Sequence, residues 1–236
     1  MTSAPGLPPN PTLIMADSSA LIQTIISEEV TPLRILRQDY GIRVVVHEAV
    51  EAEIKWRIQK TFPGKLPTLK KILSTNTVEV LSRTLLTDQG YKASTALIEQ
   101  IETLGQRFSL RIDRGEAYSH AAGNVLGVPT LTQDLTAIWA LIDDGIDVQR
   151  PILRAFDAMI FGVQIQVIDW AACAKARRHL HKAGEDILPC FANCSVEDGV
   201  ANFYLRLCDA DTPPIGANGR VEKFDDRIYI RKLART

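Results

Sequence analysis

Short apolar runs rich in β-branched residues alternate along this chain with longer stretches of helical periodicity. The runs Leu13–Ala16, Ile42–Val46 and Val128–Thr132 are predicted to be buried strands, and a helical pattern follows each of them. Strands that alternate with helices are typical of α/β domains built on a parallel sheet. We therefore predict a three-layer α/β/α sandwich with a central, mostly parallel sheet.

The same reasoning assigns the other elements of this domain. Strands are also predicted over Thr77–Leu81 and Val163–Ile168. Helices are predicted from Ser18 onward and over Val30–Gln38, Glu48–Gln59, Gly90–Arg107, Asp113–Leu126, Leu135–Ile142, Ile152–Phe161 and Trp170–His181. Gly127, directly after residue 126, is a good C-cap residue.

Composition changes at both ends of the chain. Residues 1–11 are rich in proline and are predicted to form a flexible leader, residues 12–183 the α/β domain, and residues 184–236 a C-terminal extension. Within the extension, Phe203–Leu207 and Arg227–Leu233 are predicted strands on either side of a loop rich in Pro, Gly and Asn. The extension is therefore expected to be β-rich and to form a hairpin-like arm.

Charge and composition exclude several classes of protein. The net charge of −1 creates no overall field for polyanions, so any nucleic-acid binding has to use local basic patches. No apolar run reaches the roughly 18 residues that span a bilayer, and the N-terminus lacks the features of a secretory signal. The four cysteines all lie in the last third of the chain, which does not indicate a disulfide framework. We expect a cytoplasmic protein without a membrane segment.

Motifs for several other chemistries are missing. The sequence has no Walker A loop, no Gly-x-Gly-x-x-Gly fingerprint and no Gly-x-Ser-x-Gly elbow, which disfavours nucleotide-cofactor and serine-hydrolase chemistry. Cys190, Cys194 and Cys208 have a spacing that fits no standard zinc site, so ordinary buried thiols are favoured there.

Four acidic residues occupy positions that a parallel sheet would bring together. Asp17 and Asp134 follow predicted strands, whereas Glu53 and Glu116 lie in predicted helices. Ligands of such sheets bind outside the carboxyl ends of the strands. Carboxylates gathered there repel one another unless a divalent cation holds them together. The pattern therefore predicts a metal-dependent hydrolase.

Three segments carry these acids in a recognisable order. They are residues 13–19, with Asp17 before two serines; residues 50–54, with Glu53 before Ile54; and residues 113–117 followed by 126–134, with Gly115-Glu116 and Thr132-Gln133-Asp134. In this order the chain resembles the PIN domain, a family of divalent-metal nucleases, from residue 13 to about residue 180. The third segment is the most specific.

The resemblance implies a Mg²⁺- or Mn²⁺-dependent ribonuclease that hydrolyses RNA phosphodiester bonds. Asp17, Glu116 and Asp134 are then expected to bind the metal ion, and Glu53 to complete the catalytic set or orient the attacking water. Many proteins of this resemblance are toxins that an antitoxin protein neutralises, and they commonly form homodimers. An antitoxin and a homodimer are therefore expected partners.

Each acid also has a simpler interpretation. Asp17 and Asp134 are suitable N-caps for the helices that follow them, and Glu116 suits the first turn of its helix. In the second segment, Glu51 and Glu48 compete with Glu53 for the inward-facing position.

Accessory candidates flank the four acids. Asp113 lies three residues before Glu116, so a helix can turn both toward one cleft. The hydroxyl groups of Ser18 and Thr132 are suited to hydrogen-bond a ligating carboxylate or the substrate phosphate, and simple capping is their alternative role.

A basic stripe follows the second segment. Lys55, Arg57 and Lys60 are candidate RNA-binding residues with Trp56 between them, and the stripe continues to Lys71 without an acid. Such a stripe can track a phosphate backbone while an aromatic ring stacks on a base. A solvated helix face beside a core tryptophan is the alternative, and it applies equally to the second basic cluster over residues 175–182.

Two other functions stay open. One is a non-catalytic module of the same fold that binds RNA or a protein, which the four occupied acidic positions disfavour. The other is a metal phosphatase for small substrates, in which the basic stripe would have no role.

Overall fold

The computed structural model describes residues 13–143, 145–146, 152–153, 155, 158–159, 162 and 167–185. The predicted leader, almost all of the C-terminal extension with its two strands, and the cysteines at positions 190, 194 and 208 lie outside the described residues. Of the strand predicted over Val163–Ile168, only Val167 and Ile168 are described, and they form a bend.

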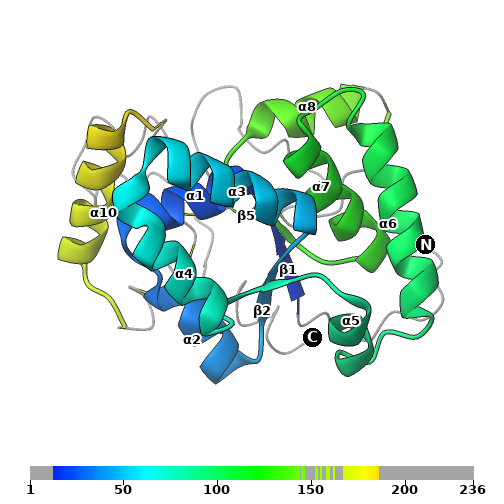
Figure 1. Ribbon diagram of the computed structural model, residues 1–236, viewed down its shortest axis with the longest axis horizontal. Coiled ribbons are helices and arrows are strands. Elements are labelled where there is room, and N and C mark those ends of the chain that lie inside the picture. The colour runs from blue at the N-terminus through cyan, green and yellow to red at the C-terminus, as the bar shows by residue number, and fades with distance from the viewer. Residues whose placement is uncertain are drawn as a thin grey trace, which may run out of the picture.

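Helices and strands alternate along the described chain (Figure 1). In order they are β1 (Leu13–Ala16), α1 (Ser18–Ser27), α2 (Thr31–Tyr40), β2 (Arg43–Val46), α3 (Glu48–Thr61), the 3₁₀ turn η1 (Pro63–Lys65), α4 (Leu66–Ser74), β3 (Val78–Val80), α5 (Arg83–Asp88), α6 (Ser94–Phe108), α7 (Arg114–Leu126), β4 (Thr130–Leu131), α8 (Leu135–Asp143), β5 (Ile152–Leu153) and α10 (Trp170–Ala183). None of the helices in the described part of the chain is long and apolar enough to cross a membrane.

The five strands form one sheet in the order β3-β2-β1-β4-β5, and every neighbouring pair is parallel. The chain starts at β1 in the middle, adds β2 and β3 on one side, and then adds β4 and β5 on the other. Successive strands are therefore placed on one side of β1 up to β3, and on the opposite side from β4 onward. In parallel α/β sheets such a switch point leaves a crevice outside the carboxyl ends of the strands.

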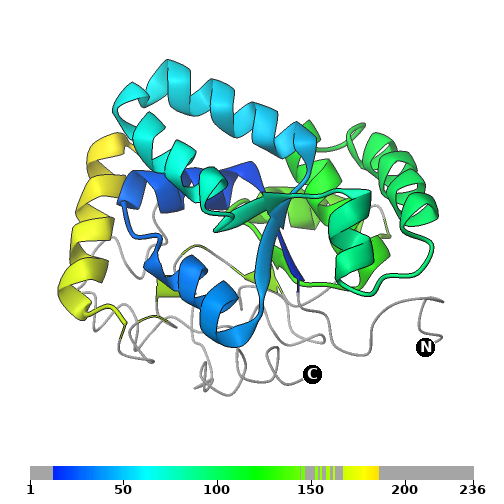
Figure 2. The same ribbon diagram turned by 60° about the horizontal axis from the view of Figure 1, so that its bottom comes forward.

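Helices cover both faces of the sheet. Ile14 and Ala16 pack with α1, α2, α3, α4 and α10 in one core cluster, whereas Leu13 and Met15 pack with α5, α6 and α7 in a second cluster. Successive strand residues point to opposite faces, so the two clusters lie on opposite sides. Figure 2 shows α4 and α5 on either side of β2. The predicted α/β fold with a parallel sheet is confirmed, and it is compatible with a three-layer sandwich.

One predicted helix begins with a strand instead. The prediction of a helix over Ile152–Phe161 is wrong at its start, because Ile152 and Leu153 form β5 and pair with Thr130 and Leu131. A short apolar run suits a strand or a helix equally well. Here the strand forms because β4 offers a free edge with which it can pair.

Two helices, α4 and α5, were not predicted from the sequence. Pro67 lies in the first turn of α4, where a proline costs no helical hydrogen bond. The prolines at 63 and 67 therefore start a helix rather than only breaking one. Helix α7 ends as predicted, with Gly127 at its C-cap in the left-handed conformation that glycine tolerates best.

Helices α3, α6 and α7 are packed together through His47 and Tyr118. His47 is the N-cap of α3, where its Nδ1 accepts a hydrogen bond from the N–H of Ala49 at 3.2 Å. The imidazole stacks on the ring of Tyr118 in α7, with 4.4 Å between the centroids. Gly105 of α6 approaches the same ring so closely that a Cβ there would lie 2.5 Å from Tyr118 Cδ1. This close contact fixes the position of α7, which carries Glu116.

Gly105→Ala is expected to lower the free energy of unfolding by about 1–3 kcal/mol, because an added methyl group in a closed helix contact forces side-chain and backbone shifts. Chemical denaturation measures the loss. Gly64→Ala is the matched control, because nothing lies within 4 Å of the added Cβ, and its effect should stay within about 0.5 kcal/mol. Equal stability of the Gly105→Ala and wild-type proteins would contradict the close packing of α6 on α7.

Candidate functional site

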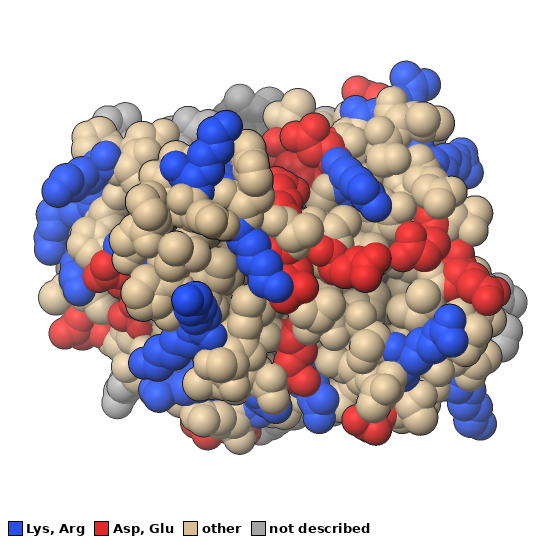
Figure 3. All heavy atoms as spheres, viewed as in Figure 1, with Lys and Arg blue, Asp and Glu red and all other residues tan. Residues whose placement is uncertain are grey.

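The four predicted acids meet at the carboxyl end of the sheet, next to the switch point. Asp17 directly follows β1 and Asp134 follows β4, while Glu53 comes from α3 and Glu116 from the first turn of α7. Figure 3 shows acidic side chains gathered along the middle of this view of the surface, with basic side chains on either side. The strand order thus brings together residues that are up to 117 positions apart in the sequence.

Asp17 is a carboxylate with no exposed surface. It accepts hydrogen bonds from the backbone N–H of Ala20 at 2.8 Å, from the hydroxyl of Ser19 at 2.9 Å and from the hydroxyl of Thr132. The first of these bonds is the N-cap of α1. Burial raises the pKa of Asp17 to about 6 in spite of these donors, and the charge of Glu53 adds to the rise.

Glu53 reaches the acidic site from α3. The hydroxyl of Ser18 donates to Glu53 Oε1 at 2.7 Å. A Cβ at Gly115 would lie 2.2 Å from Glu53 Oε2, so the carboxylate occupies space that only a glycine leaves open. This contact gives a physical reason for the Gly-Glu pair at the start of α7.

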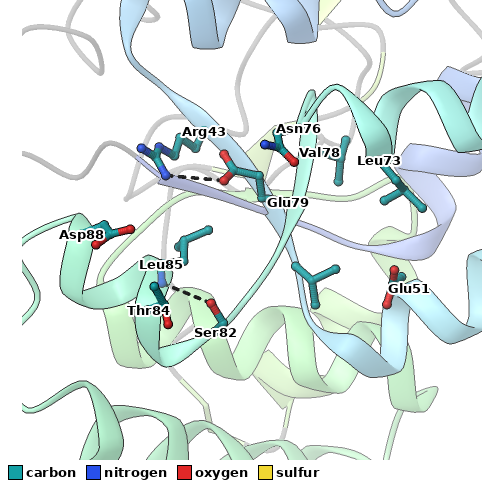
Figure 4. A pocket seen from close by; sticks show the side chains of 11 residues that line it. Arg43, Glu51, Leu73, Asn76, Val78, Glu79, Ser82, Thr84, Leu85 and Asp88 are labelled. Atoms are coloured by element: carbon teal, nitrogen blue, oxygen red, sulfur yellow. Dashed lines mark hydrogen bonds and ion pairs between the residues drawn. The ribbon is translucent and has the colours of Figure 1, made fainter.

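Glu51 lies away from the acidic site. Its carboxylate forms an ion pair with Lys55 at 2.7 Å and lines a pocket of about 350 Å³ beside the edge strand β3. Figure 4 shows this pocket, in which Arg43 and Glu79 form an ion pair at 3.4 Å. None of the four acids of the site lines it. Glu48, the other rival of Glu53, is an exposed residue at the start of α3.

Glu116 is at the electrostatic centre of the site and is only 9% exposed. Burial raises its pKa to about 9, helped by the charges of Asp17, Asp134 and Asp113 and by a hydrogen bond with Asp134. A carboxyl group with such neighbours keeps its proton at neutral pH when no cation is bound. The protonated Glu116 then donates the hydrogen bond that Asp134 accepts.

Asp134 and Thr132 complete the polar end of β4. Asp134 accepts a hydrogen bond from the N–H of Thr136 at 2.7 Å at the start of α8, and its own N–H donates to Thr132 Oγ1 at 3.2 Å. Thr132 is fully buried, and its hydroxyl group connects the two acids, because it accepts from the N–H of Asp134 and donates to the carboxylate of Asp17. Asp113 is exposed at the N-cap of α7 and influences Glu116 through its charge.

The donor set suits a hard divalent cation. Carboxyl and hydroxyl oxygens from both strand ends and both helices lie at one edge of the sheet, and Mg²⁺ and Mn²⁺ prefer such oxygens. A cation would also offset the negative charge that raises the pKa of Glu116. Within the described residues, no three Asp, Glu, His or Cys side chains already form a coordination cluster. Binding therefore requires side-chain rotations, above all in the hydrogen-bonded pair of Glu116 and Asp134.

Two residues of the site were not singled out from the sequence. Ser19 donates to Asp17 and accepts from the N–H of Gln133 at 3.0 Å, so it joins the end of β1 to the segment after β4. His120 lies one turn after Glu116 and is fully buried, and burial lowers its pKa to about 4. The available signals were the second hydroxyl after Asp17 and the four-residue spacing from Glu116.

The basic stripe on α3 is partly engaged by acids. Lys55 has the ion pair described above, and Arg57 pairs with Glu185 at 3.1 Å. The ammonium group of Lys60 lies 4.6 Å from the ring centroid of Trp56, and Trp56 is 60% exposed. The interpretation of Trp56 as a core residue is therefore wrong. In the second basic cluster, Lys175 and His179 lie beside Glu28.

Comparisons with models of protein families, with curated proteins and with solved structures returned no significant match for this chain. The geometry and electrostatics of the acidic site are therefore the basis for a functional proposal.

The metal-free protein is expected to lose stability as the pH rises from about 5 to about 9. The folded-state pKa of Glu116, about 9, lies above its ordinary value of 4.5, and that of Asp17, about 6, lies above 3.8. The folded state therefore retains protons that the unfolded chain has already released. This stabilisation is complete below the ordinary values and is lost as the pH passes the folded-state values.

Glu116→Gln isolates the larger shift, because glutamine keeps a hydrogen-bond donor and cannot ionise. In EDTA, its Tm should fall much less than that of the wild type at alkaline pH and end several degrees higher, given about 2–4 °C per kcal/mol for a chain of this size. Glu99→Gln, on the exposed face of α6, is the control and should follow the wild type. A wild-type Tm that rises over this pH range, or a Glu116→Gln profile parallel to it, would contradict the buried, proton-holding Glu116.

Proposed function

We propose that this protein is a Mg²⁺- or Mn²⁺-dependent ribonuclease of the PIN-domain type that hydrolyses RNA phosphodiester bonds. The observation that carries this proposal is the electrostatic coupling of four buried or half-buried carboxyl groups at the switch point of a parallel sheet. A site made only to cap helices has no need for such coupling, because each cap uses one carboxylate by itself. A site for a divalent cation and a phosphate does need it.

Asp17, Glu116 and Asp134 are the proposed metal-holding residues. When bound, a divalent cation supplies charge that offsets the phosphate and favours ionisation of an attacking water. Ser19 and Thr132 hold the Asp17 carboxylate in place through their hydroxyl groups. Such support keeps ligating carboxylates in one orientation and reduces the reorganisation needed for the reaction.

Glu53 has a separate proposed role. Its carboxylate is held by Ser18 at 2.7 Å and lies against Gly115, which places it beside the buried Asp17. A carboxylate in this position can accept a proton from the water that attacks the phosphodiester, or orient that water. Asp113 contributes negative charge at the rim of the site rather than a buried ligand.

Trp56 supports RNA as the substrate. It lies three residues after Glu53 and four before Lys60, so the three side chains follow one side of α3. An exposed indole ring beside a carboxylate site offers a stacking surface for a base, and Lys60 adds positive charge next to it. The phosphate chain of RNA can then run from this ring to the acids.

The proposal also covers the cellular role, the location and the oligomeric state of the protein. A role as the toxin of a toxin–antitoxin pair and a homodimer follow from the resemblance to the PIN domain, and a cytoplasmic location follows from the sequence features described above.

A second candidate function is a metal phosphatase for small substrates. The ion pairs of Lys55 with Glu51 and of Arg57 with Glu185 favour it, because they leave less positive charge for a long polyanion than the sequence indicates. The two functions share the acids and differ in their dependence on Trp56 and Lys60.

The acids are tested by RNA cleavage with Mg²⁺ or Mn²⁺. Asp17→Asn, Asp134→Asn and Glu53→Gln should each lower the rate by about 100-fold or more, because each removes a metal ligand or the proton acceptor. Glu51→Gln is the matched control for Glu53→Gln, since it removes the same charge from the same helix on the side away from the site. If the wild type cleaves no RNA with either metal, or the Glu51 and Glu53 variants lose the same activity, the assignment fails.

Trp56→Ala should weaken RNA binding by roughly 5- to 150-fold, the equivalent of the 1–3 kcal/mol that stacking contributes per base. Binding of a labelled single-stranded RNA to the Asp17→Asn protein measures this effect without cleavage. Leu110→Ala is the control, because Leu110 is also a large apolar residue at the surface, 81% exposed. Unchanged RNA affinity of Trp56→Ala, together with hydrolysis of a small phosphate ester, would favour the phosphatase instead.

A further inference from the structure

His120 is a fully buried histidine for which neither ring nitrogen has a hydrogen-bond partner within the described residues. A buried polar atom without a partner loses its hydrogen bonds to water and gains none in return, which destabilises the fold. An apolar side chain of similar size would fill the same space without that cost. Buried nitrogens in this state indicate an ion or a water molecule that completes them.

The position of His120 on α7 directs it toward the acidic site. Glu116 and His120 are four residues apart and lie on the same side of the helix. Ser119 donates to the carbonyl of Ala16 at 3.1 Å, and a Cβ at Gly123 would lie 2.5 Å from Thr130 Oγ1. This side of α7 therefore packs against the ends of β1 and β4.

Two further observations concern the polar groups of β4 and the segment that follows it. Asp134 is the charged residue whose field acts on the imidazole. Thr130 Oγ1, in β4, and Gln133 Oε1, two residues after that strand, are also buried without a partner among the described residues. His120 and this segment thus carry several buried polar atoms that no described residue satisfies.

We propose that His120 is a nitrogen ligand of the cation site, so that the site binds a first-row transition cation such as Mn²⁺ in preference to Mg²⁺. This inference rests on the proposed metal site and specifies which cation that site binds. Imidazole is a good ligand for transition metals, whereas Mg²⁺ binds oxygen donors and keeps its water shell. A histidine and an acid four residues apart on one helix can share one ion.

The neutral state of the imidazole suits this role. Burial keeps the ring uncharged at neutral pH, so one nitrogen has a free lone pair and the other carries a proton. The lone pair is available to a cation, and the N–H remains available to an oxygen nearby.

Calorimetric titration of Mn²⁺ and Mg²⁺ into the full-length protein tests this proposal. His120→Leu should weaken Mn²⁺ binding by about 10-fold or more and change Mg²⁺ binding by less than about 3-fold. His181→Ala, at an exposed position of α10, is the control and should change neither. Equal weakening of both cations, or no weakening of either, would overturn the assignment of His120 as a ligand.

A spectroscopic measurement on the wild type avoids any folding defect of the variant. Pulsed electron paramagnetic resonance of the Mn²⁺-loaded protein should show modulation from a directly coordinated ¹⁴N nucleus. Bound Mn²⁺ without nitrogen modulation would overturn the ligand proposal and leave the proposed ribonuclease intact. Bound Mn²⁺ with nitrogen modulation but no RNA cleavage would instead reject the ribonuclease and keep the ligand. Absence of Mn²⁺ binding would reject the ligand proposal, and absence of binding of both Mn²⁺ and Mg²⁺ would reject the ribonuclease as well.

Discussion

Burial of carboxyl groups beside one another at one end of a parallel sheet is the constraint on which this structure depends. The strand order puts Asp17 and Asp134 on either side of the switch point between β1 and β4, and α3 and α7 add Glu53 and Glu116. Burial and these neighbours raise the pKa of Glu116 to about 9, so Glu116 keeps its proton in the metal-free protein. A divalent cation can replace that proton on Glu116. Burying these carboxyl groups is unfavourable in the metal-free protein, and a bound cation would offset that unfavourable free energy.

Capping and ligand binding are compatible roles for the same acids. Asp17 caps α1 through the N–H of Ala20, and Asp134 accepts from the N–H of Thr136 at the start of α8. A carboxylate offers about four lone-pair positions, so one capping bond leaves capacity for a hydroxyl or a cation. The caps also fix the direction of each carboxylate before any ligand arrives. Helix starts at the carboxyl ends of strands therefore serve the local structure and the site at once.

The sequence predicted the parts of the site that depend on local pattern. An acid after a buried strand identified Asp17 and Asp134, and the strand–helix alternation predicted the parallel sheet. The choice of Glu53 over Glu51 depends on tertiary packing, because Gly115 and Ser18 meet only one of these two residues of α3. The pairing of Arg57 with Glu185, 128 residues away, and the strand β5 likewise depend on contacts that no local pattern contains. His120 was missed because one buried histidine on a helix usually has only a packing role.

The central claim is that Asp17, Glu116 and Asp134 bind one divalent cation at the switch point. Crystals of the protein grown or soaked with Mn²⁺, measured at a wavelength where manganese scatters anomalously, test it most directly. The account predicts an anomalous peak between Asp17, Glu116 and Asp134, with the hydrogen bond between Glu116 and Asp134 broken. A protein that diffracts well in saturating Mn²⁺ and has no peak there, or that binds the ion only elsewhere, would contradict it.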